Sequence, residues 1–331
     1  MLVPLLLIAT TFRSQAIETK VIDFPDAKSI VLSDTGFMAQ LNDDSVYTMS
    51  LTGKREKLLD KCSYVSAGGV IVTRVGNRSS KVLLGNKSVD KNVFGEVVAT
   101  SKYSVLALDT KYYYLVPDSG KIAELSSDKE GEKVVGIPKF SGDGQYCIFY
   151  MSKPRQSLSM PQLSSLNLYR GTRSTVSVPG GVGFAASDYT EDGYFVGSWT
   201  KLAQSDSYDH YVDGTVTSVG SGTFFMANKP GLILSSGELV KISIPDLEKY
   251  YSVRLVKSIE KGKFLVEASQ EAGQEVSHGS EFFVLDRTSG KLDRIADYKN
   301  LILDDFDSKT SRALFRILFQ GRTKWLYVKF E

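Results

Sequence analysis

Apolar residues recur at every second position, in short runs, along nearly the whole chain. The runs are rich in Val, Ile, Tyr and Phe, and clusters of Gly, Asp, Asn and Ser separate them. A period of two is typical of strands with one buried face. Polar hinges at residues 41–46 and 116–121 join such runs and hold residue types that tolerate tight turns, so each predicts a hairpin. The pattern therefore predicts an all-β protein.

Residues 246–261 allow two interpretations. Leu247, Leu255 and Ile259 belong to an apolar series with a spacing of four, and Gly262 is placed to end a helix. Residues 251–255 also alternate between apolar and polar positions, as a strand does. The pattern leaves helix and strand open.

A unit of four strands recurs along the sequence. Each unit has an apolar strand, a turn with Ser, Asp or Gly, a second strand, a variable connection, a third strand, a Gly turn and a fourth strand. The units are roughly 40 residues long, which is the size of a propeller blade. The unit starts lie near Ser29, Cys62, Glu96, Lys133, Gly183, Thr223, Ser252 and Leu301. The unit at Thr223 is the weakest, so the sequence predicts one β-propeller of four-stranded antiparallel blades, with seven or eight blades.

The last unit has three strands, at residues 301–305, 313–319 and 324–330, and lacks a fourth. The segment 18–24 precedes the first complete unit and alternates apolar Val21, Ile22 and Phe24 with polar neighbours, but has no blade of its own. An unpaired outer edge would expose a row of backbone donors and acceptors. We therefore expect this N-terminal strand to complete the last blade and close the ring.

Residues 138–146, with the sequence Pro-Lys-Phe-Ser-Gly-Asp-Gly-Gln-Tyr, resemble the repeat of the TolB-type, WD40-like propellers. That repeat has a Pro, an aromatic residue, Ser-Pro-Asp-Gly and an apolar strand; here Gly142 replaces the second Pro. Other units keep fragments at residues 33–36, 191–193 and 307–309. The resemblance covers nearly all of the chain after residue 16. It implies a propeller, found in binding proteins, assembly factors and accessory domains of serine peptidases, and it implies no catalytic residue.

The first sixteen residues contain an apolar run from Leu2 to Ala9, followed by Ser14-Gln15-Ala16. Ser14 and Ala16 are small residues at the two positions that a signal peptidase recognises. This resembles a secretory signal. The run is shorter than the ~20 apolar residues that a membrane span needs. No Lys or Arg precedes it, so a first hydrophobic strand is the alternative. We expect a signal peptide at 1–16, a propeller domain at 17–331, and export to the periplasm or the medium.

The amino-acid composition limits the kinds of partner, catalytic site and metal site that the chain can form. The chain has 40 basic and 38 acidic residues and a formal net charge of +2, so a nucleic-acid partner has no electrostatic footprint. Cys62 and Cys147 permit a disulfide, but a buried thiol is the commoner reading for Cys147 in its strand-like run. The sequence holds two His residues and shows no nucleophile elbow and no zinc-ligand spacing. The closely spaced carboxylates at 304–307 and 206–213 offer oxygen ligands for calcium, but neither group follows the spacing of a known calcium loop. We interpret them as exposed turn residues, and expect no metal and no cofactor.

The connections between second and third strands carry the functional prediction. They are long at residues 152–163, 201–207 and 270–279 and short in other units, and in a propeller they lie on one face. The candidate binding residues on this face are Lys153, Arg155, Gln156, Lys201, Asp206, Tyr208, His210, Glu275 and His278. We expect a non-enzymatic binding or assembly protein for a protein, peptide or glycan, acting as a monomer or within an envelope complex. A glycan-directed hydrolase or lyase with carboxylates in the central pocket is the alternative.

Overall fold

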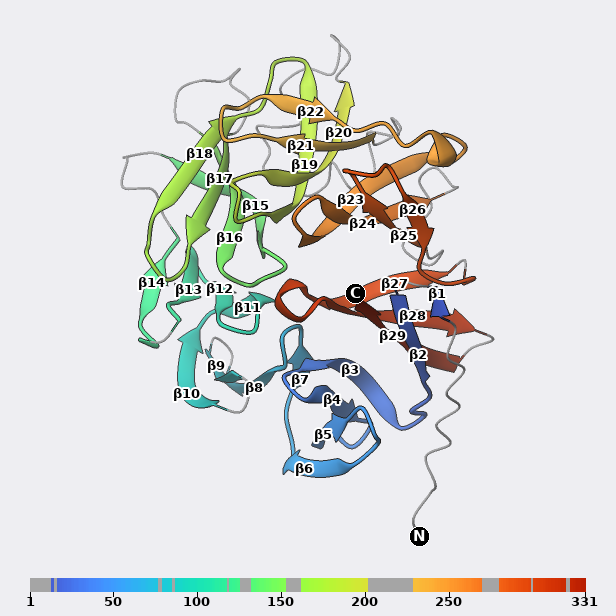
Figure 1. The fold of residues 1–331 in the computed structure, drawn as a ribbon. Helices are drawn as coiled ribbons and strands as arrows, with labels where there is room; N and C mark the ends of the chain where they lie inside the picture. Colours follow the sequence, from blue (N-terminus) through green and yellow to red (C-terminus); the bar gives the residue numbers. More distant parts are fainter. Residues whose placement is uncertain are drawn as a thin grey trace. The chain divides into compact units, whose positions relative to one another are not determined.

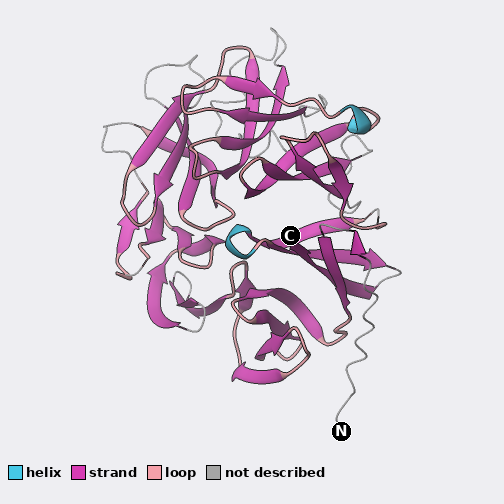
Figure 2. Cartoon of the chain, in the orientation of Figure 1, coloured by secondary structure: helices cyan, strands magenta, loops and turns pink. Residues whose placement is uncertain are grey.

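The computed structural model describes residues 13–14, 17–76, 79–84, 87–117, 119–125, 132–152, 162–201, 229–269, 280–298, 300–319 and 322–331. Within these ranges the chain is built from β-strands, and its helical content is the two single 3-10 turns Pro245–Leu247 and Ser308–Thr310 (Figure 2). The described part contains no helix long and apolar enough to cross a membrane.

The described strands form seven antiparallel sheets, six of four strands and one of five. This is the strand organisation of a seven-bladed β-propeller, which confirms the predicted fold and decides for seven blades. The predicted unit start at Thr223 is wrong as a blade boundary. Strands on both sides of that position, β20 (Phe195–Lys201) and β21 (Lys229–Ile233), pair within one sheet, so this segment belongs to the connection inside a blade. Thr223 itself lies outside the described residues.

The chain divides into two compact units, of which unit 1 combines residues 1–123 and 295–331. Four sheets belong to unit 1, and the last residue of β14, Glu124, falls in unit 2; Figure 1 labels their strands. The first sheet has β1 (Arg13–Ser14), β2 (Ile17–Ile22), β29 (Arg322–Phe330), β28 (Arg312–Phe319) and β27 (Leu301–Asp307). The second has β3 (Ala27–Ser33), β4 (Gly36–Leu41), β5 (Val46–Ser50) and β6 (Arg55–Leu59). The third has β7 (Tyr64–Ser66), β8 (Val70–Gly76), β9 (Ser79–Leu84) and β10 (Lys87–Phe94). The fourth has β11 (Glu96–Thr100), β12 (Val105–Leu108), β13 (Tyr112–Leu115) and β14 (Ile122–Glu124).

The N-terminal strand completes the last sheet of unit 1, as the alternation at residues 18–24 predicts. Strand β2 pairs with β29 from Ile17 opposite Phe330 to Ile22 opposite Trp325, and the two strands lie side by side in Figure 1. Ile22, at 2 % exposed, packs in one core cluster with Trp325. Strand β2 is therefore held both by backbone hydrogen bonds to β29 and by the packing of its buried side chains in the core.

Unit 2, residues 124–294, holds the other three sheets. The fifth sheet has β15 (Lys133–Phe140), β16 (Tyr146–Ser152), β17 (Gln162–Asn167) and β18 (Arg173–Ser177). The sixth has β19 (Val182–Tyr189), β20, β21 and β22 (Leu239–Lys241). The seventh has β23 (Ser252–Glu260), β24 (Lys263–Ser269), β25 (Glu281–Asp286) and β26 (Leu292–Arg294). Neighbouring sheets bury apolar side chains between them, and the cluster around Leu232, Leu255 and Val266 draws on the sixth and seventh sheets.

The ambiguous segment 246–261 forms a 3-10 turn followed by a strand. The turn Pro245–Leu247 begins at a proline, and β23 then runs from Ser252 to Glu260. Val253 and Leu255 are buried while Arg254 is exposed, which is the strand period of two. Pairing of β23 with β24 outweighs the helical spacing, because short apolar runs do not specify a helix without tertiary support.

The motif that carries the family resemblance is the turn between β15 and β16. The Ser141 hydroxyl and the Gln145 N–H both donate to the Asp143 carboxylate, and Gly144 has a φ of 70°. Asp organises the turn through its own backbone bonds, and Gly supplies the left-handed conformation that other residues avoid. The motif therefore has a structural role.

Both cysteines are buried free thiols. Burial raises the pKa of the Cys62 thiol to about 11 and raises that of Cys147 further. Both side chains are therefore protonated and unreactive at neutral pH, in line with the interpretation of Cys147 as a small core residue.

Candidate functional site

Asp188 fixes one end of unit 2. Its carboxylate accepts the Gly142 N–H at 2.7 Å, from the first turn of the fifth sheet, and the Ser258 N–H at 2.8 Å, from β23 of the seventh. The neighbouring Tyr189 N–H, just before the first turn of the sixth sheet, donates to it at 2.9 Å. The first hairpins of all three sheets therefore meet at this end, which we call the hairpin end.

The long connections leave unit 2 at its opposite end. Each second strand, β16, β20 and β24, runs away from the hairpin end, because it follows the first hairpin of its sheet. The second and third strands are joined by residues 153–161, 202–228 and 270–280. The second connection is longer than the predicted 201–207. Three adjacent sheets thus place their long connections at one end of one unit, which we call the connection end.

Unit 1 has short chain segments at the matching positions. Residues 42–45, 109–111 and 320–321 suffice between its second and third strands. A carboxylate braces one of these tight turns, since the Ser45 N–H and hydroxyl both donate to Asp43. The contrast predicted from the sequence between long and short connections is therefore present as a contrast between the two units.

Lys201 is the one predicted binding residue that the structure describes. It is exposed, ends β20 and pairs with Val182 across the sheet, so it stands at the root of the longest connection. The other predicted site residues lie outside the described part of the chain: Lys153, Arg155, Gln156, Asp206, Tyr208, His210, Glu275 and His278.

Two lysine ammonium groups lie near the ring of Trp199, two residues before Lys201 on β20. The Lys241 ammonium lies 4.5 Å and the Lys229 ammonium 5.9 Å from the Trp199 ring centre. Gly231 leaves the space that the indole fills, since a Cβ there would come within 2.8 Å of it. Cation–π attraction and this close packing hold the indole in place.

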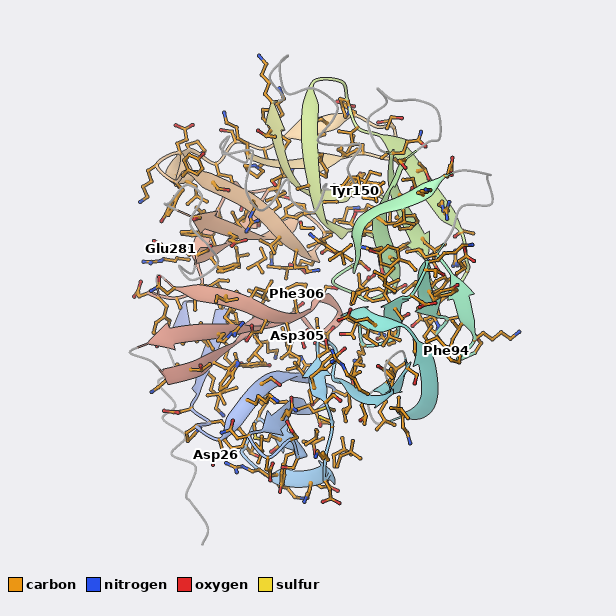
Figure 3. All side chains as sticks on the ribbon, turned by 180° about the vertical axis from the view of Figure 1, so that it is seen from behind. Asp26, Phe94, Tyr150, Glu281, Asp305 and Phe306 are labelled. Atoms are coloured by element: carbon orange, nitrogen blue, oxygen red, sulfur yellow. The ribbon has the colours of Figure 1, made fainter. Side chains whose placement is uncertain are left out.

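Two ion networks hold the root of the third connection. Glu267 accepts from Arg254 at 2.6 Å and from the Ser280 hydroxyl at 2.7 Å. The buried Glu281, labelled in Figure 3, accepts from Arg294 at 2.9 Å and from Tyr250 at 3.0 Å. Burial, followed by this bond to Glu281, raises the pKa of the Tyr250 hydroxyl. These carboxylates are paired and therefore anchor the strand ends.

The carboxylates at 304–307 are not the exposed turn residues that the sequence suggests. Asp305 is 6 % exposed and accepts the Leu32 N–H at 2.9 Å, the Gly68 N–H at 3.1 Å and the Phe306 N–H at 2.8 Å. Asp304 is partly buried and pairs with Arg316. Figure 3 shows Asp305 and Phe306 together on β27. Asp305 is thus the counterpart in unit 1 of Asp188 in unit 2.

Gly68 lies in close contact with the backbone of Lys102. Its φ is 75°, and a Cβ there would lie 2.2 Å from the Lys102 backbone nitrogen. Only glycine fits such a contact. The bond from Gly68 to Asp305 therefore depends on both residues.

The sequence reasoning missed a repeated position on the first strand of several sheets. Asp188 and Asp305 each stand directly after a β-bulge. Lys139 and Lys257 hold the same position on β15 and β23. An aromatic residue follows Lys139, Asp188 and Asp305, and this pair ahead of the turn is the signal that could have revealed the position. Within the described residues, no group of three or more metal-ligating side chains gathers.

No family model and no curated protein matches the chain. Among solved structures, an oligogalacturonate lyase in complex with manganese is 10 % identical with a TM-score of 0.52, covering 97 % of this chain and 96 % of its own. An oligogalacturonate lyase from Vibrio parahaemolyticus is 9 % identical with a TM-score of 0.51, covering 95 % and 93 %. A TolB-like protein from Agrobacterium tumefaciens is 13 % identical with a TM-score of 0.38, covering 96 % and 98 %. At such identities the likeness is one of β-propeller fold.

Proposed function

We propose that this protein is an exported, non-enzymatic binding or assembly protein that recognises a protein, peptide or glycan at the connection end of unit 2. The observation that carries the proposal is the placement of three long connections on adjacent sheets of one unit. Long surface segments on a rigid scaffold are where proteins usually place recognition. The apolar N-terminal segment supports export.

The described roots of these connections suit such a role. Two lysine ammonium groups contact the Trp199 ring, and the strands of the seventh sheet are tied by paired carboxylates. A fixed root limits the conformational freedom that a connection loses on binding, which favours affinity. Lys201 adds an exposed cation two residues after Trp199 on the same strand.

The test is a triple substitution in the connections. Arg155→Ala, Tyr208→Ala and His210→Ala together should leave the circular-dichroism melt within about a degree, because surface changes cost under ~0.5 kcal/mol each. The same variant should fail to capture the partner that the unaltered protein retains from the native envelope or medium, identified by mass spectrometry and confirmed with purified material. Tyr and Arg are frequent at binding hot spots, so their loss should weaken binding strongly.

The matched control alters a first turn in each unit. Asp34→Ala and Asp192→Ala remove exposed carboxylates from first turns, each of which pairs with a lysine. These variants should retain the partner. Capture by the triple variant, combined with loss in the control variants, would place the binding surface at these first turns and refute the proposal.

A glycan-directed lyase or hydrolase is the second candidate. It is favoured by the two oligogalacturonate lyases, whose fold this chain shares over nearly its whole length. Incubation with oligogalacturonate and Mn²⁺, with detection of the unsaturated product by its ultraviolet absorbance, tests it directly. Turnover that disappears with His210→Ala or His278→Ala would favour the enzyme over the binding protein.

A further inference from the structure

Three charged residues occupy the same post-bulge position on adjacent first strands of unit 2. Lys139 is the first paired residue after the bulge in β15, Asp188 after that in β19, and Lys257 after that in β23. Strand β19 contacts both β15 and β23. The three side chains therefore come from the same level of three neighbouring first strands, and Lys257 lies close enough to Asp188 for the two charges to interact.

The carboxylate is already satisfied. Asp188 accepts three backbone N–H groups, from Gly142, Tyr189 and Ser258. It holds one negative charge against the two lysines, and Arg254 adds a third cation three residues before Lys257. Arg254 is balanced by Glu267 at 2.6 Å. One positive charge of the group thus has no counter-charge in the described part of unit 2.

Lys257 is held in place and keeps donor capacity. Its ammonium lies 3.4 Å from the Phe140 carbonyl and 3.4 Å from the Ser187 carbonyl, on the two neighbouring sheets. An ammonium carries three N–H donors, so one remains. The bond to Phe140 places this ammonium next to the residue that follows Lys139.

Lys139 is the uncompensated cation. The described residues include no carboxylate within ion-pair distance of it. Its side chain reaches solvent, yet burial, and then repulsion by Lys257 and Arg254, lower its pKa. An anion beside Lys139 would offset the repulsion from these neighbouring cations.

We propose that Lys139 and Lys257 form a binding site for an oxyanion, a carboxylate or a phosphate-type group, at the hairpin end of unit 2. This site lies at the opposite end from the long connections, so it is independent of the binding role proposed for them. The expected ligand is small or is the charged group of a larger molecule, with Lys139 supplying ammonium donors from one side and Lys257 from the other.

The test is titration of the full-length protein by calorimetry at low salt with citrate, with sulfate and with neutral maltotriose as separate probes. Citrate or sulfate should bind and raise the melting temperature, and maltotriose should do neither. Preference for citrate would identify a carboxylate ligand, and preference for sulfate a tetrahedral one. No binding by either anion would overturn the proposal.

The decisive variant is Lys139→Met. It should weaken anion binding at least tenfold and leave the melting temperature of the ligand-free protein unchanged or raised, because it removes a repulsive charge. A merely structural lysine would instead lower that melting temperature. Lys139→Arg should retain binding and covers the case in which the Met variant fails to fold.

Lys133→Met is the matched control, since Lys133 is an exposed lysine on the same strand β15. It should bind the anions as the unaltered protein does. Equal weakening by Lys133→Met and Lys139→Met would show attraction by surface charge in general and would refute a defined site.

Discussion

Asp188 and Asp305 each connect three sheets of one unit through backbone hydrogen bonds, but the charges near the two carboxylates differ. Each stands after a bulge on a first strand, is buried, and accepts backbone N–H groups from three sheets. Burial raises the pKa of both carboxyl groups, but the nearby Lys257 opposes the rise at Asp188, whereas the carboxylate of Asp307 adds to the rise at Asp305. The comparison shows that backbone donors alone suffice to hold such a carboxylate.

The same comparison separates architecture from recognition. Unit 1 has short connections and a carboxylate without a compensating cation, and it takes its last strand from the N-terminal segment. Unit 2 has long connections, and lysines hold the position after the bulge on two of its three first strands. The features that suit ligand binding therefore gather in unit 2.

Removal of residues 17–24 should have the largest effect and should fall on unit 1. It deletes strand β2 and the buried side chains of Ile17, Ile22 and Phe24, each contributing about 1.5–3 kcal/mol. We expect the melting temperature to fall by at least several degrees, with hydrogen exchange increased in β27–β29 more than in unit 2. Unchanged thermal stability and monodispersity would show that β2 does not hold its sheet.

Alanine at the two aspartates should come next. Asp188→Ala and Asp305→Ala each leave three backbone N–H groups without their acceptor, at about 1–3 kcal/mol per buried group before water relieves some of them. Chemical denaturation should show a loss of several kcal/mol in either variant. Asp188→Ala should be the more harmful because it also leaves Lys257 uncompensated. Equal losses would mean that Lys257 contributes little to this site.

The pH dependence should distinguish the carboxylates. Burial raises the pKa of Asp305 from 3.8 to about 6. The folded state then binds the proton more tightly than the unfolded chain, so this contribution is fully present below pH ~4 and is lost as the pH rises through 6. The stability advantage of the unaltered protein over Asp305→Asn should therefore shrink by up to ~3 kcal/mol between pH 4 and pH 8. An advantage that grows over this range would contradict the raised pKa.

The smallest expected effects are those of the ion pairs at the first turns. Asp34 contacts Lys102 in unit 1, and Asp192 lies 3.7 Å from Lys261 in unit 2. Burial opposes the charge of Lys102, but the bond to Asp34 outweighs it, and the pKa of Lys102 is raised. Asp34→Asn should cost at most ~1 kcal/mol and Asp192→Asn almost nothing, because exposed pairs contribute little. High salt should abolish the difference.

The period of two in apolar residues was sufficient to predict the blades, because each strand buries alternate side chains. The Asp and Gly residues between the strands marked the turns. The period failed to predict the structure where strand pairing, and not the local sequence pattern, determines the conformation. Residues 246–261 carry both periods, and pairing with β24 decided between them. The segment around Thr223 resembled a blade start because a long connection contains strand-like composition of its own.

The site chemistry was less accessible. Asp305 belongs to a run of acidic residues that looks like a solvated turn, and its burial follows from contacts with Leu32 and Gly68, far away in sequence. Lys139 lies within the repeat motif, but the anion site proposed for it also needs Lys257, which belongs to another sheet. Charges become a site only when the fold brings distant strands together, and single-sequence patterns do not record such distances.

The pairing of β2 with β29 also sets the order in which the protein can finish folding. Strand β2 precedes every strand of unit 2 in the chain, and its partner, residues 325–330 of β29, follows all of them. Every strand of unit 2 is available before that partner exists. A loop spanning almost the entire chain must close to form this ladder, with the entropy cost that long-range contacts carry. Until then β2 presents a free edge, which makes the interval before closure the period of greatest exposure to aggregation.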